Sequence, residues 1–139
     1  MADVRRVTES FAVAPQLSVK DVADLKVLGF KTLINNRPDE EAPYDARAEA
    51  MRQAAEAAGL AYVHAPFVGM PTGEAVDAAA KAAGPAIAYC RSGTRSIHAW
   101  AMAQAKTGRL TPDAIIDLGR GAGYDLAPLK DLLRSLGSK

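Results

Sequence analysis

The chain has 139 residues, a formal net charge of +1, 49% hydrophobic residues and 24% charged residues. We therefore expect a single domain over residues 1–139, long enough to bury a core of its own. The near-neutral charge gives no reason to expect nucleic acid or an acidic membrane surface as a partner. One cysteine excludes an internal disulfide, and the N-terminus lacks the apolar stretch of a signal peptide, so we expect a cytoplasmic protein.

Apolar runs and helical spacing alternate along the chain. The expected strands lie at residues 4–7, 11–13, 30–35, 60–65 and 85–89. The expected helices lie at residues 19–29, 44–58, 72–83, 97–105, from 112 to a glycine-rich break at 119–123, and 125–136. Tyr44 is expected on the apolar stripe of its helix. This alternation predicts a three-layer α/β/α fold with a mostly parallel sheet of four to five strands.

The most informative stretch joins a buried strand to a helix through Cys90-Arg91-Ser92-Gly93-Thr94-Arg95-Ser96. Backbone N–H groups in such a loop and at the helix start lack acceptors, so they form a nest for an anion. Gly93 allows backbone angles closed to other residues, and Arg91 and Arg95 add positive charge that favours a thiolate at Cys90. We expect Cys90 to be the nucleophile and Arg95 the oxyanion ligand.

The remaining loop residues are expected to bind substrate. Arg91 steers anions inward, while Ser92, Gly93 and Thr94 contribute to the nest. Ser96 donates its hydroxyl to the thiolate, acts as the helix N-cap, or does both. The alternative for Cys90 is a purely structural role, as a small buried side chain at the end of a strand.

Two further loops are expected at the same edge of the sheet, because ligands of parallel sheets bind at the carboxyl ends of the strands. The first holds Arg37 and Asp39, where Arg37 binds a second oxyanion or an acceptor carboxylate, or simply pairs with Asp39. The second, residues 66–71, follows the strand that holds His64. His64 either hydrogen-bonds the cysteine loop or its substrate, or is a satisfied core histidine. We expect these loops and the cysteine loop to surround one pocket.

The cysteine loop resembles the active-site loop of rhodaneses, in which CRSGxRS-type sequences are frequent. Protein tyrosine phosphatases place five residues between cysteine and arginine, whereas four separate Cys90 from Arg95 here.

Over nearly its full length the chain is similar to bacterial beta-lactamase-hydrolase-like protein phosphatases, also described as a sulfurtransferase family. The similar segments are 30–39, 62–64, 88–96 and 122–126. This resemblance implies a protein-tyrosine-phosphatase-like fold with the cysteine loop between a central strand and a helix. The resemblance also implies that some relatives are fused to sulfide-oxidising modules. This suggests a sulfide-oxidation enzyme as a partner.

The leaving group separates the chemical hypotheses. Phosphoester cleavage expels a strongly basic oxygen and needs a proton donor, but residues 66–71 contain no aspartate. Asp39 could serve only if its loop swings over Cys90. Sulfane transfer expels a weaker base and needs a thiolate alone.

Our leading hypothesis is therefore a sulfurtransferase that moves sulfur from thiosulfate or a persulfide, through a Cys90 persulfide, to a thiol such as glutathione. The alternatives are a cysteine-dependent phosphatase and a non-catalytic sensor of anions or persulfides. No cofactor is expected, and the few histidines and single cysteine give no metal-binding pattern.

Overall fold

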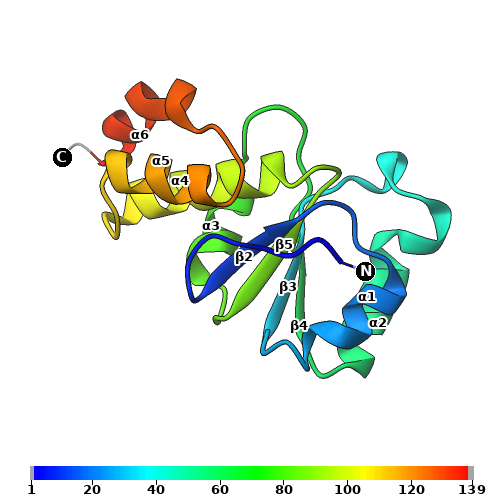
Figure 1. Ribbon diagram of the computed structural model, residues 1–139. Helices are drawn as coiled ribbons and strands as arrows, with labels where there is room; N and C mark the ends of the chain where they lie inside the picture. Colours follow the sequence, from blue (N-terminus) through cyan, green and yellow to red (C-terminus); the bar gives the residue numbers. More distant parts are fainter. Residues whose placement is uncertain (1, 138–139) are drawn as a thin grey trace.

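The computed structural model describes residues 2–137, which form a five-stranded sheet with helices on both faces (Figure 1). The strands are β1 (Arg5–Arg6), β2 (Phe11–Ala14), β3 (Thr32–Asn35), β4 (Ala61–His64) and β5 (Ala86–Tyr89). Their spatial order is β1-β2-β5-β3-β4, with β1 antiparallel to β2 and the other neighbours parallel. The expected three-layer α/β/α fold with a mostly parallel sheet is confirmed.

The helices follow the strands in alternation. They are α1 (Val19–Leu25), α2 (Ala48–Ala57), α3 (Gly73–Lys81), α4 (Thr94–Thr107), α5 (Pro112–Gly121) and α6 (Lys130–Gly137), with short 3-10 turns at Asp39–Glu41, Tyr44–Ala46 and Ala127–Leu129. Helices α1 and α2 cover one face of the sheet, and α3 and α4 cover the other, with α5 and α6 packed outside them (Figure 1). The end of β5 therefore lies in the middle of the fold, directly before α4.

Side chains of the central strand alternate between the two halves of the core. Ala86 and Ala88 of β5 face the larger cluster under α4, whereas Ile87 and Tyr89 face the cluster under α1 and α2. All four are buried, as expected for a strand covered on both faces. This burial fixes the register of β5 and hence the position of Cys90, the next residue.

Several sequence expectations about element ends are wrong, including the start of the last helix, which is Lys130 and not residue 125. The helix after the cysteine loop begins at Thr94, because Gly93 with φ 91° provides its left-handed N-cap. Tyr44 lies in a short 3-10 turn and is 83% exposed, because Pro43 is the N-cap of that turn and α2 begins only at Ala48. Helix α5 continues through the first glycines of the expected break, since Gly119 is needed where Leu126 packs against it.

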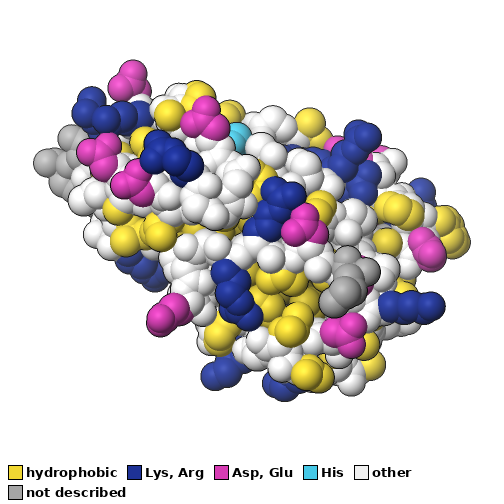
Figure 2. Space-filling model, in the orientation of Figure 1, with side chains coloured by type: hydrophobic (Ala, Val, Ile, Leu, Met, Phe, Trp, Pro, Cys, Tyr) yellow, Lys and Arg dark blue, Asp and Glu magenta, His cyan; other side chains and the backbone are white. Residues whose placement is uncertain are grey.

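The carboxyl ends of β3, β4 and β5 lie at one edge of the sheet, as parallel strands require. The segments that leave them are residues 36–47, 65–72 and 90–93. Within residues 2–137, no helix combines the length and the apolar character needed to cross a membrane. On the face shown in Figure 2, basic and acidic side chains are interspersed with hydrophobic ones.

Candidate active site

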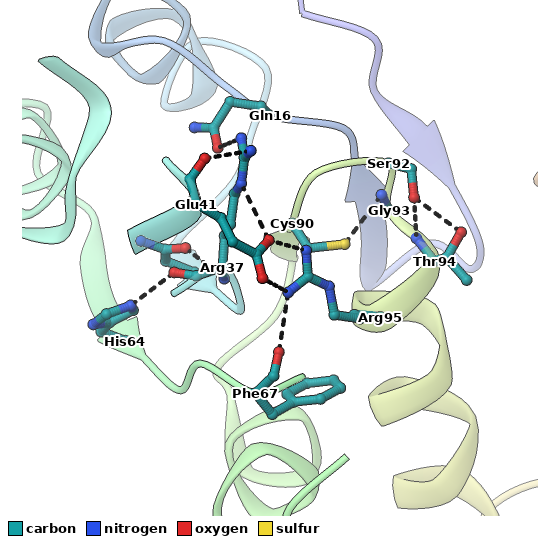
Figure 3. A network of polar contacts seen from close by, with 11 residues as sticks. Gln16, Arg37, Glu41, His64, Phe67, Cys90, Ser92, Gly93, Thr94 and Arg95 are labelled. Atoms are coloured by element: carbon teal, nitrogen blue, oxygen red, sulfur yellow. Dashed lines mark hydrogen bonds and ion pairs between the residues drawn. The ribbon is translucent and has the colours of Figure 1, made fainter. Parts of the chain in front are cut away.

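Cys90 lies at the end of the central strand and is completely buried. The backbone N–H of Gly93 points back at it and donates a hydrogen bond to Sγ over 3.1 Å (Figure 3). This return is possible because Gly93 adopts φ 91°, an angle that favours glycine. Helix α4 starts one residue later, so the positive end of its dipole lies beside the sulfur. The loop thus places a donor and a favourable field at Cys90.

Arg95, in the first turn of α4, is the residue at which the three loops meet. Its Nη1 donates to the carbonyl oxygen of Phe67 over 3.1 Å, and its two terminal nitrogens hold both carboxylate oxygens of Glu41 over 2.6 and 3.1 Å. The hydrogen bond with Glu41 raises the pKa of Arg95, and the nearby Cys90 sulfur raises it further. Arg95 therefore lies where an oxyanion ligand is expected, with a carboxylate already bound to it (Figure 3).

Arg37, at the end of β3, approaches the same carboxylate from the other side. Its Nη1 donates to Oε1 of Gln16 over 2.8 Å, its Nη2 donates to the carbonyl oxygen of Glu41 over 2.6 Å, and its Nε lies 3.7 Å from Glu41 Oε1. That Nε is buried and has no hydrogen-bond partner. The Gln16 backbone N–H in turn donates to the carbonyl of Arg91, which ties the Arg37 side chain to the cysteine loop.

The expected pairing of Arg37 with Asp39 is wrong. The carboxylate of Asp39 instead accepts a hydrogen bond from the backbone N–H of Ala48 over 2.8 Å. Helix α2 begins at Ala48 without a side-chain cap from its own N-cap residue, Arg47, so Asp39 supplies an acceptor that the first turn lacks. Asp39 is consequently occupied away from Cys90 and is not placed as a proton donor.

Ser96 is wrongly expected to cap the helix or bind the thiolate. It lies inside α4, is fully buried, and donates its hydroxyl to Oδ1 of Asn36 over 2.8 Å. Asn36 completes the link by donating to the carbonyl of Ala65 over 2.9 Å. This chain of hydrogen bonds fastens α4 to the segments that follow β3 and β4, so the role of Ser96 is structural.

His64 contacts the site only indirectly. Its Nε2 lies 3.0 Å from the carbonyl oxygen of Arg37, which makes it a satisfied histidine at the end of β4 and not a partner of the cysteine loop (Figure 3). Ser92 and Thr94 hydrogen-bond each other through their hydroxyls over 3.1 Å. Both are exposed, as is Arg91 at the entrance to the loop.

Tyr124 supports the cysteine loop from outside. Its hydroxyl donates to the carbonyl oxygen of Ser92 over 2.9 Å. A Cβ added to Gly93 would come within 2.0 Å of the Tyr124 hydroxyl oxygen. The guanidinium of Arg5 lies 5.2 Å from the centre of the Tyr124 ring. Burial raises the pKa of Tyr124, so the hydroxyl keeps its proton for Ser92. The loop is thus held from β1 and from the turn after α5 as well as from its own ends.

Glu41 is the site residue that sequence reasoning misses. The hydrogen bond from Arg95 lowers its pKa, and the charges of Arg95, Arg37 and Arg91 lower it further, so the carboxylate is ionised at neutral pH. Fifty-four positions separate it from Arg95, and no local pattern links the two. The signal that was available is the position of Glu41 in the polar segment after a buried strand, which any parallel sheet brings to its ligand-binding edge.

The described residues offer no site for a metal. Within residues 2–137, no three His, Cys, Asp or Glu side chains gather closely enough to hold an ion. The arrangement provides a cysteine sulfur with a backbone donor aimed at it. It also provides two guanidinium groups, those of Arg95 and Arg37, on either side of the Glu41 carboxylate. These parts suit attack by a thiolate on an anionic group.

The fold and this loop define a phosphatase-like α/β domain with a buried cysteine at the end of its central strand. The chain belongs to the family described as "Beta-lactamase hydrolase-like protein, phosphatase-like domain", whose model matches residues 3–107.

Beta-lactamase hydrolase-like proteins are similar to it in sequence. The one from Agrobacterium fabrum is 36% identical over 126 residues, which cover 87% of this chain and 29% of that protein. One from Xylella fastidiosa is 32% identical over 125 residues, which cover 86% of this chain and 29% of that protein. The chain thus spans less than a third of the length of these relatives.

Solved structures agree on the fold. A candidate phosphatase from Neisseria meningitidis matches with a TM-score of 0.76 and 29% identity, over 94% of this chain and 96% of its own. PTPMT1 in complex with PI(5)P matches with a TM-score of 0.73 and 12% identity, over 96% of this chain and 94% of its own. Kinase-associated phosphatase matches with a TM-score of 0.71 and 16% identity, over 93% of this chain and 88% of its own. The expected tyrosine-phosphatase-like fold is confirmed, whereas none of these matches supports the rhodanese-type assignment.

Proposed function

We propose that the chain is a cysteine-dependent phosphatase that hydrolyses phosphate monoesters through a phosphocysteine at Cys90. The observation that carries the proposal is the cysteine loop, in which the Gly93 N–H donates to Cys90 and the first turn of α4 places Arg95 next to the loop. This loop occurs in a fold shared with solved phosphatase structures. The phosphatase-like family supports the same reading.

The reaction would run in two displacements. The Cys90 thiolate attacks phosphorus, a sulfur–phosphorus bond forms, and the bond to the ester oxygen breaks with its electron pair on the leaving group. Arg95 and the loop N–H groups stabilise the charge on the transferred phosphoryl group. Water then attacks phosphorus, phosphate departs, and the thiolate is regenerated. Since a single cysteine suffices, the cycle needs no second thiol.

Protonation of the leaving group sets the expected substrate range. The segment between β4 and α3 contains no carboxyl side chain at residues 66–71, and Asp39 is bound to the start of α2. We therefore expect esters with weakly basic leaving groups, such as 4-nitrophenyl phosphate, to be cleaved much faster than alkyl phosphates.

The test is hydrolysis of 4-nitrophenyl phosphate by the wild-type chain and by Cys90→Ser. The wild type should turn over and should accumulate a phosphocysteine on acid quenching, visible by mass spectrometry, whereas Cys90→Ser should show neither. Undetectable hydrolysis by folded wild-type protein, with no phosphocysteine, would refute the phosphatase proposal.

Sulfur transfer is the second candidate, and two observations favour it. Four residues instead of five separate Cys90 from Arg95. In addition, no side chain at residues 66–71 can act as a proton donor, and sulfane transfer does not need one. In that reaction the thiolate attacks the outer sulfur of thiosulfate, sulfite departs, and glutathione or another thiol takes the sulfur from the Cys90 persulfide.

The same protein preparation separates the two candidates. Incubation with thiosulfate should add one sulfur atom to Cys90, and glutathione should remove it, if sulfur transfer is the reaction. A stable persulfide that glutathione leaves in place would instead indicate the sensor. Persulfide formation would in addition make a sulfide-oxidising enzyme in the cytoplasm a reasonable partner to test.

A further inference from the structure

Glu41 holds the guanidinium that the proposed chemistry requires for its substrate. Both terminal nitrogens of Arg95 are bound to the two carboxylate oxygens, over 2.6 and 3.1 Å, in a side-by-side arrangement. Guanidinium groups bind carboxylates and phosphates through the same pair of parallel N–H donors. An oxyanion that approaches Arg95 in this way therefore meets a carboxylate already in its place.

The surroundings of Glu41 are those of a bound anion. Arg37 Nε, buried and otherwise without a partner, lies 3.7 Å from Glu41 Oε1, and the charge of Arg91 also acts on the carboxylate. Three arginines thus act on one carboxylate, which is about one-third exposed. Figure 3 shows this carboxylate between the side chains of Arg37 and Arg95, on the side of the loop that carries Cys90.

The segment that carries Glu41 is suited to releasing it. Glu41 ends a three-residue 3-10 turn in which no residue is buried. Two residues that precede it are also held by other parts of the chain, Arg37 by Gln16 and Asp39 by the start of α2. Rotation of the Glu41 side chain therefore frees Arg95 without moving β3 or unfolding the site.

We propose that Glu41 is an internal competitor for the anion site: its carboxylate occupies Arg95 in the free protein and is exchanged for the oxyanion of the substrate. The proposal rests on the proposed function only in taking Arg95 as the oxyanion ligand, and it applies equally to a phosphate ester and to thiosulfate. It makes Glu41 a specificity-determining residue, because an anion must bind Arg95 better than a tethered carboxylate does.

Selectivity between anions follows from this exchange. A dianion such as phosphate or thiosulfate gains more from Arg37, Arg91 and Arg95 than a monoanion does, so it displaces Glu41 more readily. Weakly charged anions are kept out of the site, including those abundant in any cell. Loss of the Glu41 charge should therefore tighten the binding of all these anions and narrow the difference between them.

The experiment measures anion binding without turnover, through protection of Cys90 from iodoacetamide by inorganic phosphate. Glu41→Gln and Glu41→Ala should each need about three- to fivefold less phosphate for half protection than the wild type, the upper part of the range expected when one partly exposed ion pair is lost. The matched control is Glu40→Gln, which removes the same charge from an exposed neighbour and should change protection by less than about twofold.

A second measurement tests whether the effect passes through Arg95. The rate of alkylation by iodoacetate, relative to that by neutral iodoacetamide, should rise in Glu41→Gln because the carboxylate of the reagent gains access to the guanidinium. In an Arg95→Ala background, Glu41→Gln should change neither phosphate protection nor the alkylation ratio by more than about twofold. The guanidinium for which Glu41 and the anion compete is then absent.

The opposite results overturn the proposal. If Glu41 instead holds Arg95 in its binding orientation, both Glu41 variants will need more phosphate for protection, not less. Unchanged protection in folded Glu41→Gln, with thermal unfolding close to that of the wild type, would show that anions bind Arg95 beside an undisturbed Glu41. Because neither reading requires catalysis, failure of the phosphatase assay leaves this test intact.

Discussion

The two segments that make the site, residues 90–95 and residues 36–47, are built on opposite plans. The first is short, follows a buried strand, enters a helix at once, and places its groups through the backbone. The second is long, contains two 3-10 turns, and places Arg37 and Glu41 through side chains. The contrast indicates that the position of the Cys90 sulfur is fixed by local backbone geometry, whereas the charge around it is set by side-chain contacts from distant segments.

The largest expected effect is at Arg95, where the two segments meet. Arg95→Lys keeps the charge but loses the paired N–H donors that hold Glu41 and would hold an oxyanion. We expect kcat/KM for 4-nitrophenyl phosphate to fall by about 10²- to 10³-fold, the usual loss when a preorganised donor is removed. The measurement is steady-state kinetics of Arg95→Lys. The control is Lys106→Arg, which makes the opposite substitution at an exposed position later in α4. A loss below tenfold would mean that the guanidinium geometry is dispensable.

Gly93 tests how rigidly the short segment is built. In Gly93→Ala the new Cβ would lie 2.0 Å from the Tyr124 hydroxyl oxygen, at a backbone φ of 91°. The strained backbone alone costs on the order of 1–3 kcal/mol, and the clash adds to it by turning the Gly93 N–H away from Cys90. We expect lower thermal stability and slower alkylation of Cys90.

The matched control for this variant is Gly29→Ala, at φ 97° with no atom near the added Cβ. It carries the backbone cost without the clash, so it should leave the reactivity of Cys90 unchanged. Equal loss of stability in the two variants would contradict the assigned role of Tyr124.

Ser96 tests the connection between the two segments. Ser96→Ala leaves Oδ1 of buried Asn36 without its donor, which should lower the free energy of unfolding by about 1–3 kcal/mol. Denaturant unfolding measures the change, with Ser92→Ala, at an exposed hydroxyl, as the reference that should change little. If Ser96→Ala unfolds at the wild-type denaturant concentration, the hydrogen bond does not fasten α4 to the β3 edge.

The smallest expected effect concerns pH. Since the hydrogen bond from Arg95 lowers the pKa of Glu41 in the folded state, the pair stabilises the protein above the ordinary glutamate range and loses this contribution as the pH falls through the lowered pKa. Exposure limits the contribution to below about 1 kcal/mol. The stability difference between wild type and Glu41→Gln should therefore shrink as the pH falls below about 4.5. A difference that grows on acidification would contradict the pairing.

The same contrast explains what the sequence could predict. The β5 run, Cys90 and the helix that follows are contiguous, so periodicity and one glycine were enough to predict the loop and its place in the sheet. Glu41 is 54 positions from its partner Arg95, and Tyr124 is 32 positions from its partner Ser92. Periodicity carries no information on such long-range pairings. The sequence pattern points to Ser96 as a helix cap, but a left-handed Gly93 starts the helix earlier than a serine cap would.

The position of Tyr124 bears on attempts to re-engineer the loop. Its hydroxyl sits against Gly93 and holds the Ser92 carbonyl, so the arc from Cys90 to Thr94 is enclosed on its outer side by a fixed ring. Lengthening the arc to the five-residue spacing of tyrosine phosphatases would require room that this ring occupies. A transplanted longer loop would thus have to be accompanied by a smaller side chain at position 124, and by a new neighbour for Arg5.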